Sequence, residues 1–133
     1  AFKCSAADYF HHLLFVGVLC PFGLTQDWGV LQNSVAFFLC GFPGGVDYAM
    51  LALVKHKMLD KMTEKHVNSY VNCWLRAPGC LLTSFMMYLS ALYGRPTASL
   101  WNVAFVLMLV AFNGQYYMQR VTANWGIKGG HPS

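Results

Sequence analysis

The sequence predicts an all-α, polytopic integral membrane protein with about four transmembrane helices that carry Pro and Gly kinks. Of its 133 residues, 56% are hydrophobic and only 11% are charged, whereas soluble domains average about 25% charged residues. So few charges could not cover the apolar surface of a soluble domain of this size. The charged residues also gather at the ends of apolar runs. With no linker or repeat to divide it, the chain reads as a single helical membrane domain over residues 1–133.

The stretch from Gly41 to Arg76 organises this prediction. Asp47 lies in an apolar run, a basic segment from Lys55 to Lys65 follows, and a second apolar run then encloses Arg76. A charge at the centre of a bilayer costs roughly 3 to more than 10 kcal/mol. Two apolar segments with one charge each, of opposite sign, joined by a cationic turn, therefore indicate a membrane hairpin built around a polar interior.

The first two segments are interrupted by proline and glycine. We expect a helix over 6–19, with Ser5 as its N-cap and Pro21 as its stop. A full span needs about 20 residues, so this helix should be tilted, partly embedded, or lengthened into the stretch 21–24. The second segment covers 28–54, where the Pro-Gly-Gly sequence at 43–45 should kink or unwind it.

The third and fourth segments complete the set. The third covers 66–92, with Thr63 as its cap and Pro78 as an internal kink. The fourth covers 97–123 and contains the most continuous apolar run. Four spans place both termini on one side of the membrane.

The distribution of basic residues agrees with this topology, because cytoplasmic-type loops are rich in Lys and Arg. The side of the termini holds Lys3, Lys55, Lys57, Lys61, Lys65, Arg120 and Lys128, and the opposite side holds Arg95. We expect both termini and the Lys55–Lys65 loop on the cytoplasmic, matrix or stromal side of an organellar or endomembrane, whether mitochondrial inner membrane, thylakoid or ER. Trp28, Tyr93 and Trp101 fit an aromatic belt at the opposite interface.

Polar residues gather in the half of the membrane near the basic side. By helical rise they lie roughly 8–16 Å below it; they are His11, His12, Asp47, Asn72, Arg76, Asn113 and Gln115. Polar groups in lipid must find partners, so these faces should turn toward one another. One interpretation is structural: Asp47 and Arg76 neutralise each other, and the rest act as interhelical glue. The other is a polar pocket that binds a lipid headgroup or performs chemistry on it.

The adjacent pair His11-His12 is open to several interpretations. Neighbours on a helix point about 100° apart, so both cannot serve one ion, and we expect neither a metal site nor haem. Asp8 shares a face with His12 and could orient it as a general base; a satisfied structural pair is the alternative. We expect no cofactor, although a bound phospholipid is compatible with the pocket. The few basic residues form no face for nucleic acid.

The order of several motifs resembles the TLC-domain membrane proteins, which include the ceramide synthases. DYFHHLLF comes first, VDYAMLALVKHKML next, then NCWLRAPGCLL and finally FNGQYY. The resemblance implies a TLC-like bundle that lacks the first spans of the family. It also implies that His11 and His12 match the family's paired histidines and Asp47 the second acid of its His-Asp…Asp motif. Where those synthases carry the His-Asp pair, this chain has Pro43 and Gly44.

These features favour a non-enzymatic subunit of a larger membrane complex, with other membrane subunits and lipids as partners. The apolar faces of four short helices need cover, and the missing acid argues against catalysis. The alternative is a lipid acyltransferase of the ceramide-synthase type that uses His11 or His12 as base and Asp47 to orient it. A proton relay through His12, Asp47 and Arg76 is a third class, but it lacks the paired half-helices of transporters.

Overall fold

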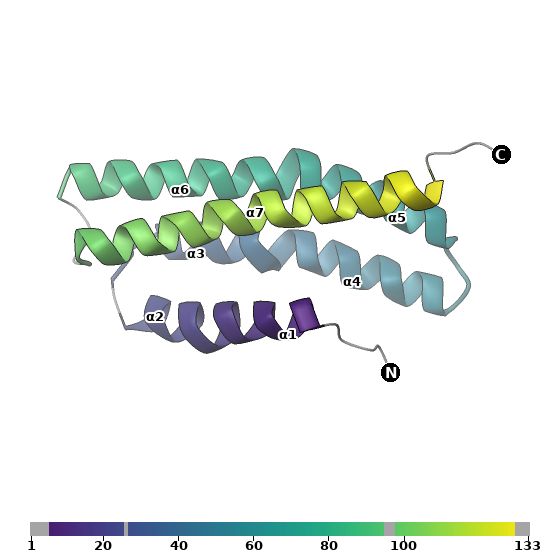
Figure 1. Cartoon of the computed structure of the whole chain (residues 1–133), viewed down its shortest axis with the longest axis horizontal. Coiled ribbons are helices and arrows are strands. Elements are labelled where there is room, and N and C mark those ends of the chain that lie inside the picture. Colours follow the sequence, from purple (N-terminus) through teal and green to yellow (C-terminus); the bar gives the residue numbers. More distant parts are fainter. Residues whose placement is uncertain (1–5, 26, 95–97, 130–133) are drawn as a thin grey trace.

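The computed structural model describes residues 6–25, 27–94 and 98–129, and for Ala7, Asp8, His11, Leu24 and Lys128 it describes the backbone alone. Most of these residues are helical, and their helices form four rods (Figure 1). Rod 1 comprises α1 (Ala6–His12), η1 (Leu13–Leu19) and α2 (Cys20–Leu24); rod 2 comprises α3 (Leu31–Ala36), η2 (Phe37–Gly41) and α4 (Phe42–Lys55); rod 3 comprises α5 (Lys61–Val71), η3 (Asn72–Arg76) and α6 (Ala77–Leu92); rod 4 is α7 (Leu100–Gly129). The all-α prediction is confirmed.

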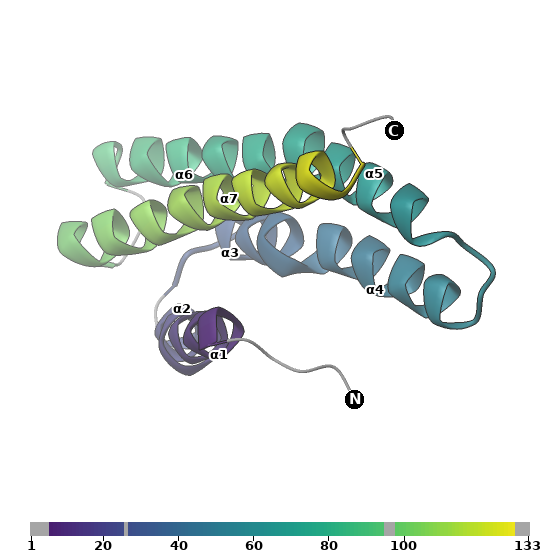
Figure 2. The same ribbon diagram turned by 45° about the vertical axis from the view of Figure 1, so that its right-hand side comes forward.

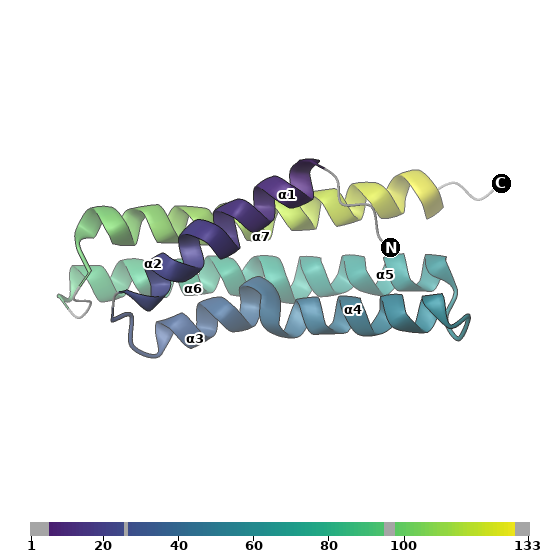
Figure 3. The same cartoon turned by 90° about the horizontal axis from the view of Figure 1, so that it is seen from below.

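Successive rods run in opposite directions along one long axis (Figure 1). The α4–α5 turn and the last turns of α7 lie toward the same end, which we name the basic end for Lys55, Lys57, Lys61 and Lys65. The α2–α3 and α6–α7 connections lie at the opposite end, the far end. Rods 2, 3 and 4 run nearly alongside one another, whereas rod 1 crosses them obliquely (Figures 2 and 3).

Each of the first three rods contains a π-helical segment, and each of these segments ends two residues before a proline. The segments η1, η2 and η3 are followed in this way by Pro21, Pro43 and Pro78. Proline lacks an N–H, and its ring crowds the carbonyl four residues earlier; a wider π turn relieves that crowding. At Pro43 and Pro78, where kinks were predicted, the structure has such a π-helical segment just before the proline. Pro21 does not stop the first helix: the rod continues to Leu24, the lengthened form that the sequence left open.

Predicted boundaries of rods 3 and 4 are wrong. Rod 4 ends at Gly129 rather than at 123. Rod 3 begins at Lys61 rather than at 66, and its N-cap is Asp60 rather than Thr63. Oδ1 of Asp60 accepts from the backbone N–H of Met62 (2.7 Å), and Oδ2 accepts from the Thr63 N–H (3.1 Å) and hydroxyl. Asp is among the best N-cap residues because its oxygens satisfy orphan N–H groups of the first turn. The proposed cap Ser5 lies outside the described residues.

The core forms mainly between α6 and α7. Cys80 of α6 and Val110 of α7 are fully buried, and Val103 is 2% exposed. The two helices come very close at Gly114, where an added Cβ would lie 2.8 Å from the Cβ of Cys80. The Ser84 hydroxyl ties them together by donating to the carbonyls of Cys80 (2.8 Å) and Leu107 (3.0 Å).

Two of the rods are long and apolar enough to cross a membrane. They are Leu31–Lys55, with 25 residues, and Lys61–Leu92, with 32 residues; the 18-residue window that qualifies each as a span has a mean hydropathy of 1.6 in the first and 1.2 in the second. The sequence predicted four such spans. Large apolar side chains are nevertheless exposed on every rod, for example Leu13 (69%), Phe37 (47%), Trp74 (78%) and Phe112 (66%).

Candidate functional site

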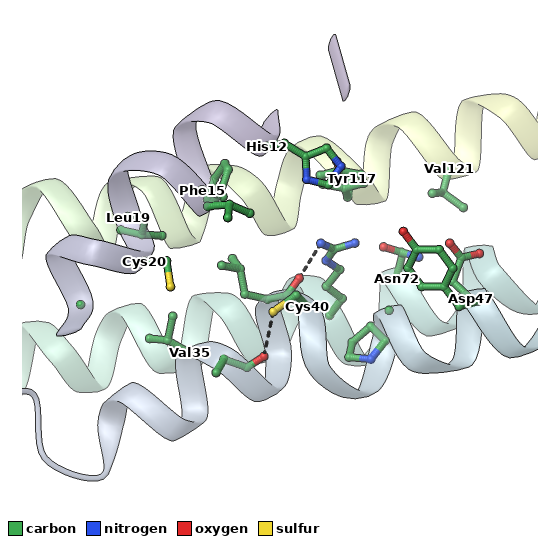
Figure 4. A pocket seen from close by; sticks show the side chains of 18 of the residues that line it. His12, Phe15, Leu19, Cys20, Val35, Cys40, Asp47, Asn72, Tyr117 and Val121 are labelled. Atoms are coloured by element: carbon green, nitrogen blue, oxygen red, sulfur yellow. Dashed lines mark hydrogen bonds between the residues drawn. The ribbon is translucent and has the colours of Figure 1, made fainter. Parts of the chain in front are cut away.

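A cavity of about 810 Å³ lies between rod 1 and the other three rods. Its volume falls in the range of small-molecule sites, roughly 300–1,000 Å³. In Figure 4, Phe15, Leu19 and Cys20 project from rod 1 toward the cavity, with Val35, Cys40 and Asp47 of rod 2 on the opposite wall. The oblique crossing of rod 1 leaves this space open.

The part of the cavity nearer the far end is mainly apolar, with Gln32 as a polar side chain in its lining. Its walls come from all four rods and include Phe15, Leu19, Trp28, Val35, Leu39, Met87 and Val106. Trp28 does not lie in an exposed aromatic belt as predicted: it is only 7% exposed and belongs to the hydrophobic core.

The part nearer the basic end is polar. Its lining side chains are His12, Asp47, Asn68, Asn72, Arg76, Tyr117, Arg120 and Asn124. The formal charges among all lining residues are two arginines and one aspartate, which leaves an excess of one positive charge with neutral histidine. The cavity is therefore amphipathic along its length.

Asp47 is held by an amide network between rods 2 and 3. Nδ2 of Asn68 donates to Oδ1 of Asp47 (2.7 Å) and lies 3.4 Å from Oε1 of Glu64, which is only 5% exposed. Nδ2 of Asn72 donates in turn to Oδ1 of Asn68 (2.7 Å). One amide thus serves two carboxylates, and the hydrogen bond fixes Asp47 at the level of Asn68.

Arg76 is held by a different set of partners. Its Nη2 donates to the carbonyl oxygen of Leu39 at 2.5 Å. Pro43, four residues after Leu39, has no N–H to offer that carbonyl, so the arginine supplies the missing donor. The guanidinium carbon also lies 4.2 Å from the centroid of the Tyr117 ring, a cation–π contact.

Asp47 and Arg76 line the same cavity, but the structure does not bring them into direct contact. Among the residues that the structure describes, no salt bridge joins them, and each carries its own hydrogen bond. The cause is the register of the antiparallel rods: Asp47 is level with Asn68, and Arg76 with Leu39.

Three buried polar atoms in the wall of the cavity lack a hydrogen-bond partner within the described part of the chain. They are Nε of Arg76, Oδ1 of Asn72 and Nε1 of Trp28. An unsatisfied buried polar group costs about 1–3 kcal/mol. Such groups are characteristic of a wall that a polar ligand completes.

The structure brings together four of the seven predicted site residues. His12, Asp47, Asn72 and Arg76 line the cavity. Asn113 and Gln115 do not: Asn113 is 1% exposed and adjoins Gly114, where α6 and α7 touch. The side chain of His11 lies outside the described residues.

The sequence analysis did not single out six polar residues that line the cavity, among them Gln32, Tyr48 and Asn68. Asn68 could have been found, because the series Asn68, Asn72 and Arg76 repeats every four residues and so lies on one helical face. Tyr117, Arg120 and Asn124 share a face of α7 in the same way. These three residues lie close to the basic end, where polar side chains are common at a helix terminus and so do not by themselves indicate a site. Among the described residues, no three His, Cys, Asp or Glu side chains are placed to hold one metal ion.

Comparisons with protein-family models, with curated proteins and with solved structures return no match to this chain.

Proposed function

We propose that this chain is a four-span membrane protein that serves as a non-enzymatic subunit of a larger membrane assembly and binds a lipid in its cavity. The observation that carries the proposal is the cavity, which is mainly apolar along one part and gathers its charged and amide side chains along the other. An amphiphile has the same division. Burying its chain gains roughly 25 cal/mol per Å² of apolar surface, and its headgroup finds donors, acceptors and charge at the other end.

The dimensions of the cavity support a lipid of the surrounding membrane. On rod 2 the lining runs from Gln32 to Leu51, which is about 28 Å by helical rise. Each leaflet contributes about half of the roughly 30 Å hydrocarbon core of a bilayer, so this length accommodates a headgroup and one layer of lipid chains. The chain of the lipid would lie toward the far end and its headgroup toward the basic end.

The outer surface supports membrane insertion. Exposed aromatic and aliphatic side chains occur on all four rods, and rods 2 and 3 satisfy the length and hydropathy of a span. A soluble monomer rarely exposes an apolar patch larger than a few hundred Å². The basic residues of the α4–α5 turn would then face the cytoplasm, matrix or stroma.

A subunit role follows from the weak attachment of rod 1. Rod 1 reaches the core through a few side chains, such as Leu19 and Phe22, while Tyr9, Phe10, Leu13 and Val16 remain exposed. Neighbouring membrane subunits would cover this surface. The resemblance to the TLC-domain proteins, some of which are non-enzymatic, agrees with the proposal.

The test is mild extraction of the native membrane, followed by sizing of the chain and mass spectrometry of its bound lipids. We expect the chain to resist extraction by alkaline carbonate and to migrate in a complex far larger than its own 14.9 kDa. A stable, lipid-free monomer, or release by carbonate, would contradict the proposal.

A lipid acyltransferase is the second candidate, because His12 and Asp47 line the same cavity. His12→Ala should then abolish acyl transfer while the chain remains in its assembly, and His56→Ala, in the α4–α5 turn, should have no effect. Equal acyl transfer by the two variants would exclude this candidate.

A further inference from the structure

The proposed lipid-binding cavity does not by itself define the chemistry of the headgroup. The placement of Asp47 and Arg76 indicates which headgroup it would bind. We propose that the cavity selects a lipid with a primary ammonium joined to a phosphate, as in phosphoethanolamine. The ammonium lies against Asp47 and the phosphate against Arg76. This inference rests on the proposed function and goes beyond it by naming the ligand class.

The two charges occupy different depths. Hydrogen bonds place Asp47 level with Asn68, and Arg76 level with Leu39. Eight residues separate Leu39 from Asp47 on rod 2, and eight separate Asn68 from Arg76 on rod 3. Both counts correspond to about 12 Å between backbone positions along the axis. The length of the arginine side chain shortens the corresponding separation between the two charged groups. Asp47 is the nearer of the two to the basic end.

This order matches the polarity of an aminophospholipid inserted from the basic end. Its ammonium is outermost, its phosphate comes next, and its chains lie deepest. Asp47, Arg76 and the apolar walls follow in the same order along the cavity. No salt bridge joins the carboxylate and the guanidinium in the described part of the chain, and the proposal places a group carrying both charges between them.

The wall between the two charges has room for such a group. On rod 2 it consists of Cys40, Pro43 and Gly44. A Cβ added at Gly44 would meet nothing within 4 Å. The headgroup can therefore approach the backbone of α4 here without displacing a side chain.

The neighbouring acceptors favour an ammonium that carries N–H donors. Oδ1 of Asn72 is buried without a partner, and Asp47 uses only its Oδ1 in a hydrogen bond that the structure records. Glu64, which shares the Asn68 amide, adds negative charge beside Asp47. A primary ammonium offers three donors to these oxygens, whereas a choline group offers none.

Arg76 supplies the complementary preference for phosphate. Its Nε–H is buried without a partner among the described residues. Guanidinium groups recognise phosphate through paired, charge-assisted hydrogen bonds. A lipid phosphate without the ammonium would satisfy Arg76 but would bring its charge toward Asp47 and Glu64.

The experiment is photo-crosslinking in membranes that contain the full-length protein in its native assembly. The probe is a diacyl phosphoethanolamine lipid with a diazirine in one chain. Competitors are unlabelled diacyl and monoacyl lipids with phosphoethanolamine, phosphocholine or phosphate heads, and free phosphoethanolamine. We expect the phosphoethanolamine lipids to compete about tenfold better than the other two heads, a difference of about 1.4 kcal/mol. Free phosphoethanolamine should not compete.

Two glycine variants show whether the crosslink arises in the cavity. Gly44→Leu should abolish it by filling the space for the headgroup. Gly45→Leu is the matched control: an added Cβ also meets nothing there, but Gly45 does not line the cavity. Both substitutions replace Gly by a better helix former, so loss of folding is not expected for either.

A charge variant isolates the ammonium. In Asp47→Asn, phosphoethanolamine and phosphate lipids should compete with the probe to within about twofold of each other, while the crosslink itself persists. Equal competition by all heads, with a crosslink that Gly44→Leu still blocks, would overturn the headgroup assignment and leave the lipid-binding cavity in place. A crosslink that Gly44→Leu does not affect would overturn the cavity itself, and competition by free phosphoethanolamine would replace the lipid with a soluble ligand.

Discussion

At the scale of single residues, Asp47 and Arg76 line one cavity, and no salt bridge joins them in the described part of the chain. Asp47 is held by the Asn68 amide, and Arg76 by a backbone carbonyl and an aromatic ring. A buried charge that lacks an ionic partner is expensive. A protein that keeps two of them at separate levels of one cavity retains the means to bind a ligand of mixed charge.

Separate partners predict independent energetics. We expect Asp47→Asn and Arg76→Gln to change the free energy of unfolding in detergent by amounts that add within about 0.5 kcal/mol in a double-mutant cycle, because sites with no shared partner behave additively. A coupling energy well above 1 kcal/mol would instead indicate a direct pair.

At the scale of the elements, proline shapes the rods by removing backbone donors. Pro43 has no N–H to donate to the Leu39 carbonyl, and the wider turn of the π-helical segment η2 accommodates the proline ring. Arg76 of rod 3 donates to that carbonyl instead. One missing N–H thus fixes the position of a charged side chain on another rod.

This arrangement predicts coupling between Pro43 and Arg76. In a Pro43→Ala background the new N–H can donate to Leu39, so Arg76→Leu should no longer strand that carbonyl. We expect Arg76→Leu to cost about 1 kcal/mol less in this background than in the natural chain, measured by unfolding in detergent. Pro78→Ala, at the corresponding point of rod 3, is the control and should leave the cost unchanged.

The start of rod 3 has a pH dependence that can be derived from its cap. The Thr63 hydroxyl and the Met62 and Thr63 N–H groups donate to Asp60 and hold its pKa below the ordinary value of 3.8. A lowered folded-state pKa means that the cap is fully effective above the unfolded value and is lost as the pH falls through the lowered one. Hydrogen exchange should therefore show the first turn of α5 fraying in acid.

Asp60→Asn is the matched variant for that measurement. Asparagine caps about as well as aspartate but does not titrate. Exchange of the Met62 and Thr63 amides should then show no additional fraying in acid. Acid fraying of the same size in this variant would mean that Asp60 is not its source.

At the scale of the whole molecule, the alternating rods place the α4–α5 turn and the end of α7 toward one end and the α6–α7 connection toward the other (Figure 1). The basic side chains cluster at the first of these ends. If that end faces the cytoplasm, matrix or stroma as proposed, the headgroup part of the cavity opens toward the same compartment.

Labelling of single cysteines in a cysteine-free background tests this orientation. In sealed membranes, an impermeant thiol reagent should reach Lys57→Cys and Ile127→Cys from the same side and Tyr93→Cys only from the other. All three positions are exposed, so a failure to label reports sidedness rather than burial. Labelling of Tyr93→Cys together with Lys57→Cys would contradict four spans.

Part of the site could be foreseen from the sequence because depth in a span follows from residue count. Counting from Lys55 and Lys65 placed Asp47, Asn72 and Arg76 in one half of the molecule, and all three line the cavity. A residue count does not say toward which neighbouring helix a side chain points. Asn113 was therefore assigned to the pocket, although it is buried where α6 and α7 touch, and Tyr117, one turn further on, was missed.

By itself, the sequence determined that this chain is helical, where its rods are interrupted, and at which end its basic residues gather. These properties follow from local composition, from proline and from spacing along the chain. Only the tertiary structure decided that rod 1 stands off obliquely to leave a cavity, and that Asp47 and Arg76 face it from different levels. Both depend on the register between antiparallel rods, which is set by long-range packing such as the close contact at Gly114.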